Sequence, residues 1–229
     1  MKNLRGVVFF LLTVLLYLGV PLAGWGLDDP GGFFALAPRA GYALVVTLFA
    51  LAVGWQSVEA PEGVRGGREE TGQRVRRQTA VRVVIDLELF GALLLLPLAD
   101  RHDLGVMPPG TGVRWAGLAL LAGGVGLVFA SGLALGRFYS PEVTLQRDHR
   151  LVTSGLYSHL RNPRYLGVIL VTAGLALVFR SWLGIFAAIF VVLVILARIP
   201  DEEALLRRAF GEEYEAYYRR SWRLLPWIY

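Results

Sequence analysis

Two polar segments in the second half of the chain carry the side chains that are best suited to chemistry. The first, residues 149–165, has the sequence H-R-L-V-T-S-G-L-Y-S-H-L-R-N-P-R-Y, and the second begins at Arg198 and contains Glu202 and Glu203. A carboxylate can bind an ammonium group or ribose hydroxyls, whereas a guanidinium group binds carboxylates. If the two segments meet, they would hold a small amino-acid-like cofactor beside an anionic acceptor.

The pair Asn162-Pro163 predicts the start of a helix. Proline is well tolerated in a first helical turn because its missing N–H has no intrahelical partner there, and the Asn162 side chain is expected to cap the helix. Free N–H groups and the positive end of the helix dipole would favour a bound carboxylate. The alternative is an ordinary capped helix with Arg164 and Tyr165 at the membrane interface.

Arg198 and Glu202 also have a purely structural interpretation. They are four residues apart, so on a continuous helix they would form a modest surface ion pair. Acidic residues in a first helical turn would also complement the helix dipole. Pro200 lies between the two residues and is expected to break the helix there.

Long apolar runs must position both polar segments. Of the 229 residues, 55% are hydrophobic, and a helix that spans a bilayer needs about 20 mainly apolar residues. The sequence therefore predicts an all-α integral membrane protein with about six transmembrane helices, at residues 4–27, 38–57, 81–98, 113–135, 164–179 and 182–197. The last two are expected to form a C-terminal helical hairpin, followed by an interfacial helix over 201–220 that is interrupted at Gly211.

Residues 1–136 would then form an N-terminal transmembrane region for substrate access, and residues 137–229 a cofactor-binding region. The first apolar run is expected to be a retained span and not a cleaved signal peptide, because no small-x-small site ends it.

The distribution of cations predicts the orientation in the membrane. With the N-terminus inside, 19 of the 23 Lys and Arg residues fall in inside segments, and only Arg39, Arg101, Arg114 and Arg180 fall outside. Because cytoplasmic loops are enriched in Lys and Arg, both termini and both polar segments are expected on the cytoplasmic side. The net charge of +5 is therefore assigned to topology and lipid contact, and not to nucleic acid, for which no basic-aromatic module is present.

Other polar or small residues give weaker indications. Asp86 and Glu88 are costly at membrane depth; Asp86 is expected to pair with Arg82, and Glu88 is a weak candidate for a substrate cavity. The three His residues do not have metal-site spacing and there is no Cys, so no metal site is expected. The run Gly123-Gly124-Val125-Gly126 lacks a preceding strand and is expected to pack helices closely instead of binding phosphate.

The two polar segments resemble the motifs of the isoprenylcysteine carboxyl methyltransferase family. The first segment, continued to Gly167, is similar to the family pattern H-x-L-V-T-x-G-x-Y-x-x-x-R-H-P-x-Y-x-G. The residues from Arg198 onward resemble its second motif, with R-x-x-x-E-E, F-G-E-E-Y-x-x-Y and R-x-x-P in order. This resemblance covers about residues 137–229, and the first four spans match only in being hydrophobic. Asn162 replaces the family's usual histidine, so hydrogen bonding is retained at that position but an acid–base role is not.

The resemblance implies an integral membrane methyltransferase that uses S-adenosyl-L-methionine without a Rossmann domain and releases S-adenosylhomocysteine. By position in the motifs, Arg198 would face the carboxylate of the methyl acceptor. The resemblance assigns to the cofactor Gln146, His149, Arg150, Leu151, Val152, Tyr157, Asn162, Pro163, Arg164, Tyr165 and Glu202. Of these, Gln146 is matched only across a gap.

These features predict methyl transfer to a hydrophobic or lipid-linked acceptor in the bilayer, most specifically the carboxylate of an isoprenylcysteine-like substrate. A carboxylate is ionised at neutral pH and needs no general base, so alignment and exclusion of water would carry catalysis. N-methylation of a phospholipid amine is the nearest alternative and requires removal of a proton. An NADPH-dependent membrane sterol reductase has a similar R-H-P-x-Y and a similar R-x-x-P-x-Y ending, and a transporter or scaffold is a third class.

Overall fold

The computed structural model describes residues 2–59, 76–135 and 151–226, and within these ranges the protein is built from helices without strands. The isolated β-bridges in these ranges pair Val106 with Ser181 and Leu160 with Trp222, which lie between helices or at their ends. The predicted all-α class is therefore confirmed for the described part of the chain.

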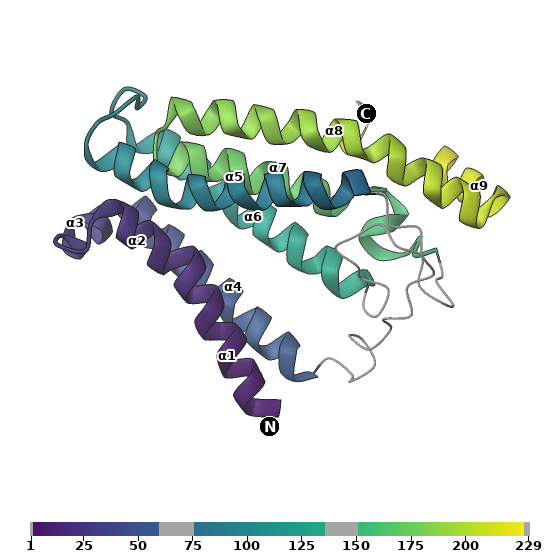
Figure 1. Cartoon of the computed structure of the whole chain (residues 1–229), viewed down its shortest axis with the longest axis horizontal. Helices are drawn as coiled ribbons and strands as arrows, with labels where there is room; N and C mark the ends of the chain where they lie inside the picture. The colour runs from purple at the N-terminus through teal and green to yellow at the C-terminus, as the bar shows by residue number, and fades with distance from the viewer. Residues whose placement is uncertain (1, 60–75, 136–150, 227–229) are drawn as a thin grey trace.

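The first helices form an arm that begins at the N-terminus. A nearly continuous helix consists of α1 (Lys2–Val14), the π-helical turn η1 (Leu15–Gly19) and α2 (Val20–Trp25). The chain then turns through α3 (Pro30–Phe34) and returns as α4 (Ala37–Glu59), which lies alongside α1 (Figure 1). In contrast, α2 packs mainly against α5.

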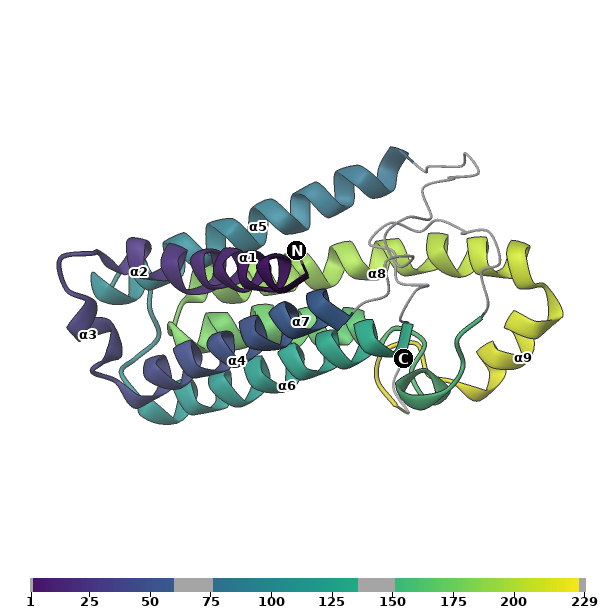
Figure 2. The same cartoon turned by 90° about the horizontal axis from the view of Figure 1, so that it is seen from below.

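The remaining helices form a bundle beside this arm. They are α5 (Arg76–Arg101), α6 (Thr111–Leu135), α7 (Pro163–Val178), α8 (Trp182–Phe210) and α9 (Glu212–Arg220). α6 and α7 share the most extensive helix contact. α9 and the segment that precedes α7 lie at one end of the molecule, and α3 lies at the other (Figure 2). The chain segments that contain the two polar motifs therefore share one end of the bundle.

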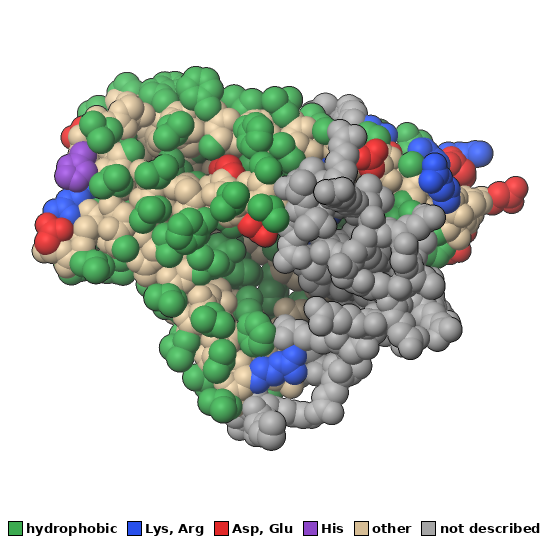
Figure 3. Space-filling model, viewed as in Figure 1, with side chains coloured by type: hydrophobic (Ala, Val, Ile, Leu, Met, Phe, Trp, Pro, Cys, Tyr) green, Lys and Arg blue, Asp and Glu red, His purple; other side chains and the backbone are tan. Residues whose placement is uncertain are grey.

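Among the described residues, four helices are long and apolar enough to cross a membrane, at Leu4–Trp25, Ala37–Val58, Thr111–Leu135 and Trp182–Phe210, and Pro163–Val178 is a shorter apolar helix. α5 is also long, but Arg82, Asp86 and Glu88 interrupt its apolar run. Hydrophobic side chains cover much of the face in Figure 3, and charged side chains gather at its left and right ends, with some acidic side chains between them. These features support a multi-pass membrane protein.

Glycines bring α6 and α7 into backbone contact. A Cβ atom added at Gly124 of α6 would lie 2.7 Å from the carbonyl oxygen of Gly167, and one added at Gly174 of α7 would lie 2.6 Å from the amide of Leu121. No real side chain tolerates such distances to backbone atoms. The predicted close packing is confirmed at Gly124, whereas Gly123 faces open space.

Pro200 does not break α8, contrary to the prediction. The helix continues through it and ends at Gly211, whose φ of 51° suits glycine. A proline within a helix costs about 3 kcal/mol, but Ile195 and Ile199 are fully buried and pack in one cluster with Leu224. Because burying such a side chain stabilises by about 1.5–3 kcal/mol, packing on the preceding turns offsets the cost. The predicted sixth span and the first half of the predicted interfacial helix are therefore one helix.

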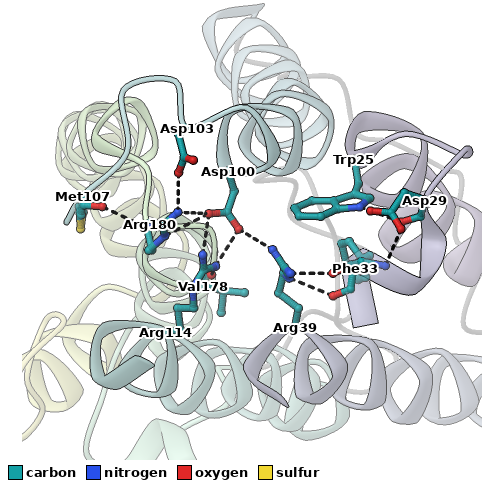
Figure 4. A network of polar contacts seen from close by, with 11 residues as sticks. Trp25, Asp29, Phe33, Arg39, Asp100, Asp103, Met107, Arg114, Val178 and Arg180 are labelled. Carbon is teal, nitrogen blue, oxygen red and sulfur yellow. Dashed lines mark hydrogen bonds and ion pairs between the residues drawn. The ribbon is translucent and has the colours of Figure 1, made fainter. Parts of the chain in front are cut away.

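A buried ionic cluster joins the helices at the end opposite the start of α7 (Figure 4). The side chain of Asp100, at the end of α5, is fully buried and accepts from three arginines. Its carboxylate oxygens lie 3.0 Å from a nitrogen of Arg39 in α4, 2.7 Å from Arg114 in α6, and 3.0 Å from Arg180 between α7 and α8. One carboxylate thereby links four parts of the chain.

The three arginines of this cluster also donate to backbone carbonyls of neighbouring segments. Arg39 donates to the carbonyls of Gly32 and Phe33, and Arg114 donates to that of Val178. Arg180 also pairs with Asp103, and the fourth cation that was predicted to lie outside, Arg101, pairs with Asp28. All four cations on the predicted outer face are therefore bound to carboxylates.

Candidate functional site

The start of α7 and the end of α8 meet through a tyrosine and a glutamate. The hydroxyl of Tyr165, in the first turn of α7, donates a 2.6 Å hydrogen bond to Oε2 of Glu202 in α8. The guanidinium carbon of Arg198, one turn earlier in α8, lies 5.8 Å from the centre of the Tyr165 ring. Because α8 is continuous across Pro200, Arg198 and Glu202 lie on one side of it. The expectation that the two polar segments meet is confirmed.

Arg164, in the first turn of α7, belongs to the same group. Electrostatic interactions link its guanidinium to Tyr157, Tyr165 and Glu202. A further interaction reaches Tyr17, which lies on the π-helical turn of the first span. π-helical turns are frequent at functional sites. Sequence reasoning nevertheless did not include Tyr17, because the sequence does not reveal such a turn. The N-terminal arm therefore contributes at least one side chain near the predicted cofactor residues.

Asn162 directly precedes α7, and Pro163 occupies the first turn as predicted. The Asn162 side chain does not cap the helix, so that prediction is wrong. Its Nδ2 instead donates a 3.0 Å hydrogen bond to the carbonyl oxygen of Arg223 in the C-terminal segment. The segment competes successfully for this side chain because the backbone after α9 is paired with the preceding loop through the bridge between Leu160 and Trp222.

Tyr157 anchors the loop that leads to α7. It lies in a short 3-10 helix, Gly155–Ser158, and is buried. Its carbonyl oxygen accepts a 2.7 Å hydrogen bond from the hydroxyl of Tyr217 in α9. Burial raises the pKa of both phenols, that of Tyr217 to about 12, so both are neutral at physiological pH.

Glu203 faces a different direction from Glu202 because successive helical residues are about 100° apart. It is 2% exposed, and its oxygens lie 3.2 Å from Arg161 and 2.7 Å from Arg223. Sequence reasoning assigned no role to these three residues. Their occurrence within the two motifs was the only indication that they matter. Their ion pairs could not be predicted, because the residues lie far apart in sequence.

The remaining predicted cofactor residues are Gln146, His149 and Arg150, which lie outside the described residues, and Leu151 and Val152, which are half-buried before the 3-10 helix. Arg82, the predicted partner of Asp86, has a side chain outside the described set. Oε2 of Glu88 is buried and has no hydrogen-bond partner among the described residues. Within the same ranges, no group of three His, Asp or Glu side chains is placed to hold a metal ion.

The chemistry of the assembled side chains suits an amino-acid-like nucleoside cofactor. Glu202 provides a carboxylate for an ammonium group or ribose hydroxyls, and Asn162 and Tyr165 provide neutral polar groups. Arg164 and Arg198 provide cations for carboxylates. The residues present therefore fit S-adenosylmethionine, the donor that the sequence resemblance implies.

Comparison with known proteins supports the resemblance. Residues 113–213 match the phospholipid methyltransferase family. A probable protein-S-isoprenylcysteine O-methyltransferase of Oryza sativa subsp. indica is 29% identical over 119 residues, which is 51% of this chain and 62% of the relative. Protein-S-isoprenylcysteine O-methyltransferase B of Arabidopsis thaliana is 29% identical over 146 residues, 61% of this chain and 74% of the relative.

A fission yeast relative, the protein-S-isoprenylcysteine O-methyltransferase of Schizosaccharomyces pombe, is 33% identical over 87 residues, 36% of this chain and 35% of the relative. The chain spans less than two thirds of the length of the rice relative named above. A solved structure of the eukaryotic intramembrane Ras methyltransferase ICMT aligns with 99% of this chain and 96% of its own, with a TM-score of 0.49 and 17% identity. The similarity to isoprenylcysteine methyltransferases that the motifs predicted is confirmed by the sequence comparisons.

Proposed function

We propose that the chain is an integral membrane methyltransferase that transfers a methyl group from S-adenosylmethionine to a lipid-linked carboxylate, such as that of an isoprenylcysteine. The observation that carries the proposal is the contact between Tyr165 and Glu202, with Arg198 beside it. This contact joins the two motifs that resemble the methyltransferase family. The named relatives act on the same class of acceptor, as their names state.

Each side chain has a defined task in this proposal. The bound donor supplies an electrophilic methyl group on a sulfonium. Glu202 and Tyr165 hold the amino-acid or ribose part of the donor, and Asn162 and Arg164 contribute further polar groups to the same site. Arg198 orients the acceptor carboxylate. Since that carboxylate is already ionised at neutral pH, the protein contributes alignment and a site shielded from water.

The membrane arrangement belongs to the same proposal. About six spans, with α5 and the α7–α8 hairpin as three of them, would place both motifs at the cytoplasmic face and the Asp100 cluster at the outer face. Four cations lie at the end that would face outward, and each pairs with a carboxylate: Arg39, Arg101, Arg114 and Arg180. This pairing supports the arrangement, because neutralised cations do not count against an outer location. The acceptor's lipid tail would stay in the bilayer and enter between the spans.

Single-cysteine labelling tests this orientation, since the chain has no natural cysteine. A membrane-impermeant maleimide added to intact cells or right-side-out vesicles should label Gly110→Cys, in the α5–α6 connection. It should label Gly66→Cys only after lysis. Labelling of both from the same side would refute the orientation.

Calorimetry on purified protein tests the cofactor assignment. S-adenosylhomocysteine should bind the wild type, and NADPH should not. Glu202→Ala should abolish binding, whereas Arg198→Ala should bind the product normally and lose turnover. Binding of NADPH alone would indicate the reductase class instead, and normal binding and turnover in both variants would refute the assigned roles.

N-methylation of a phospholipid amine is the second candidate, favoured by the family that residues 113–213 match. An amine must lose a proton before or during transfer, and Glu202 or Tyr165, which are bonded to each other, would be the candidates to accept it. The two candidates form different products, a methyl ester from a carboxylate and an N-methyl group from an amine. Base hydrolyses the ester and releases its methyl group as methanol, whereas the N-methyl group stays intact.

A further inference from the structure

The C-terminal segment after α9 is bonded along the loop that precedes α7. The amide of Arg161 donates to the carbonyl oxygen of Trp222, and the amide of Trp222 donates to the carbonyl oxygen of His159, each at 2.8 Å. The side chain of Asn162 adds its bond to the carbonyl of Arg223. The backbone just before the candidate cofactor residues is therefore held by a segment some 60 residues downstream.

Glu203 is at the centre of this junction. Its Oε1 accepts from Nε of Arg161 at 3.2 Å and from Nε of Arg223 at 3.1 Å, and its Oε2 accepts from Nη2 of Arg223 at 2.7 Å. The side chains of Glu203 and Arg161 are 3% and 7% exposed. One buried carboxylate thus ties the loop, α8 and the C-terminal segment together.

Arg161 extends the junction to the end of α9. Its Nη1 donates to the carbonyl oxygens of Tyr218 and Ser221, and its guanidinium carbon lies 4.1 Å from the centre of the Tyr218 ring. Hydrogen bonds to charged groups are stronger than neutral ones, and leaving one partner buried alone is costly. Loss of the Glu203 carboxylate would therefore loosen both sides of the junction.

We propose that Glu203, Arg161 and Arg223 form a clasp that positions Asn162 and the first turn of α7 for the methyl donor. The inference rests on the proposed function and divides the Glu202-Glu203 pair into two roles. Glu202 touches the donor, whereas Glu203 acts through Asn162 and is a positioning residue. The clasp therefore controls donor affinity and leaves acceptor binding largely unchanged.

Glu203→Gln tests the clasp, with Glu215→Gln as the matched control. Glu215 is also paired with an arginine, at 2.6 Å from Nε of Arg207, but both side chains are about 40% exposed, so solvent screens this pair and its loss should cost little. In calorimetry of the full-length protein in detergent, Glu203→Gln should bind S-adenosylhomocysteine about tenfold more weakly than the wild type, equivalent to about 1.4 kcal/mol. Glu215→Gln should bind within twofold of the wild type.

Steady-state kinetics separates positioning from simple destabilisation. At a temperature where the variant stays folded, Glu203→Gln should raise the KM for the donor about tenfold and leave the KM for the acceptor within twofold. Amide hydrogen exchange at Arg161 and Trp222 should also become faster than in the control. If Glu203→Gln does not fold, Arg223→Lys, which retains the charge but loses the Nε contact, should show a smaller change of the same kind.

The outcomes distinguish the clasp from the function on which it rests. If the wild type does not bind S-adenosylhomocysteine, the proposed function fails and the clasp's role fails with it. If the wild type binds, but a folded Glu203→Gln or Arg223→Lys protein binds equally well, the clasp alone is overturned. A lowered melting temperature with both KM values unchanged would likewise reduce Glu203 to a structural role.

Discussion

Replacing Asp100 by Asn should destabilise the protein strongly. The substitution keeps the size of the side chain but removes the one buried charge that faces Arg39, Arg114 and Arg180 (Figure 4). It also places an amide donor against guanidinium groups that donate. Removal of one partner from a buried ionic network costs about 3–5 kcal/mol, a large part of a total stability of about 5–15 kcal/mol.

Asp103→Asn is the matched control. Asp103 contacts the same Arg180 at 3.0 Å, but its side chain is 77% exposed, so its loss should cost no more than about 1 kcal/mol. At about 2–4 °C per kcal/mol for a chain of this size, the apparent melting temperature should fall by about 6–20 °C for Asp100→Asn. For Asp103→Asn it should fall by less than about 4 °C.

Thermal unfolding of the two variants in one detergent, followed by circular dichroism at one scan rate, measures this difference. A common scan rate is needed because membrane proteins often unfold irreversibly. Equal shifts for the two variants would refute the reasoning, since burial would then not distinguish the two carboxylates.

Three further variants test other parts of the structure. Gly124→Ala should lower the melting temperature because its Cβ would lie 2.7 Å from backbone atoms of α7. Gly123→Ala, at a position that faces open space, should raise the melting temperature slightly. Equal effects would contradict the α6–α7 contact. Tyr165→Phe removes the hydroxyl that donates to the carboxylate of α8 and should weaken calorimetric binding of S-adenosylhomocysteine about tenfold; unchanged affinity would exclude that hydrogen bond from the site. The raised pKa of Tyr217, about 12 against 10, predicts stability that is present below pH 10 and lost as the pH rises toward 12, because only the unfolded phenol ionises at the lower value. Melting temperatures of Tyr217→Phe should therefore fall less between pH 9 and pH 11.5 than those of the wild type, and parallel curves would contradict the assignment.

Local patterns in the sequence were enough to locate the helices and the junction of the motifs. Apolar runs predicted helices close to their observed bounds, and Pro163 marked the start of α7. The meeting of Tyr165 with Glu202 followed from counting spans, since an even number of crossings between two segments returns the chain to one side. These properties depend on composition and periodicity, which can be read directly from the sequence.

Properties that depend on distant partners were not predictable. Asp100 pairs with residues 61, 14 and 80 positions away, and nothing near it in sequence marks it as the centre of a cluster. Pro200 was expected to break α8 because the packing that offsets its cost comes from other segments. Asn162 was expected to cap its own helix, but the backbone of Arg223 offers it a different partner. In each case tertiary contact overrode a sound local preference.

Transfer of a labelled methyl group by the purified protein tests the central claim most directly. The protein would be reconstituted in vesicles with tritiated S-adenosylmethionine and either a farnesylated cysteine or an aminophospholipid, with Glu202→Ala as the inactive control. The account predicts base-labile label, released as methanol, on the farnesylated cysteine only. Base-stable label on the phospholipid would replace the proposed acceptor by the second candidate. Absence of transfer to both, or equal transfer by Glu202→Ala, would contradict the account.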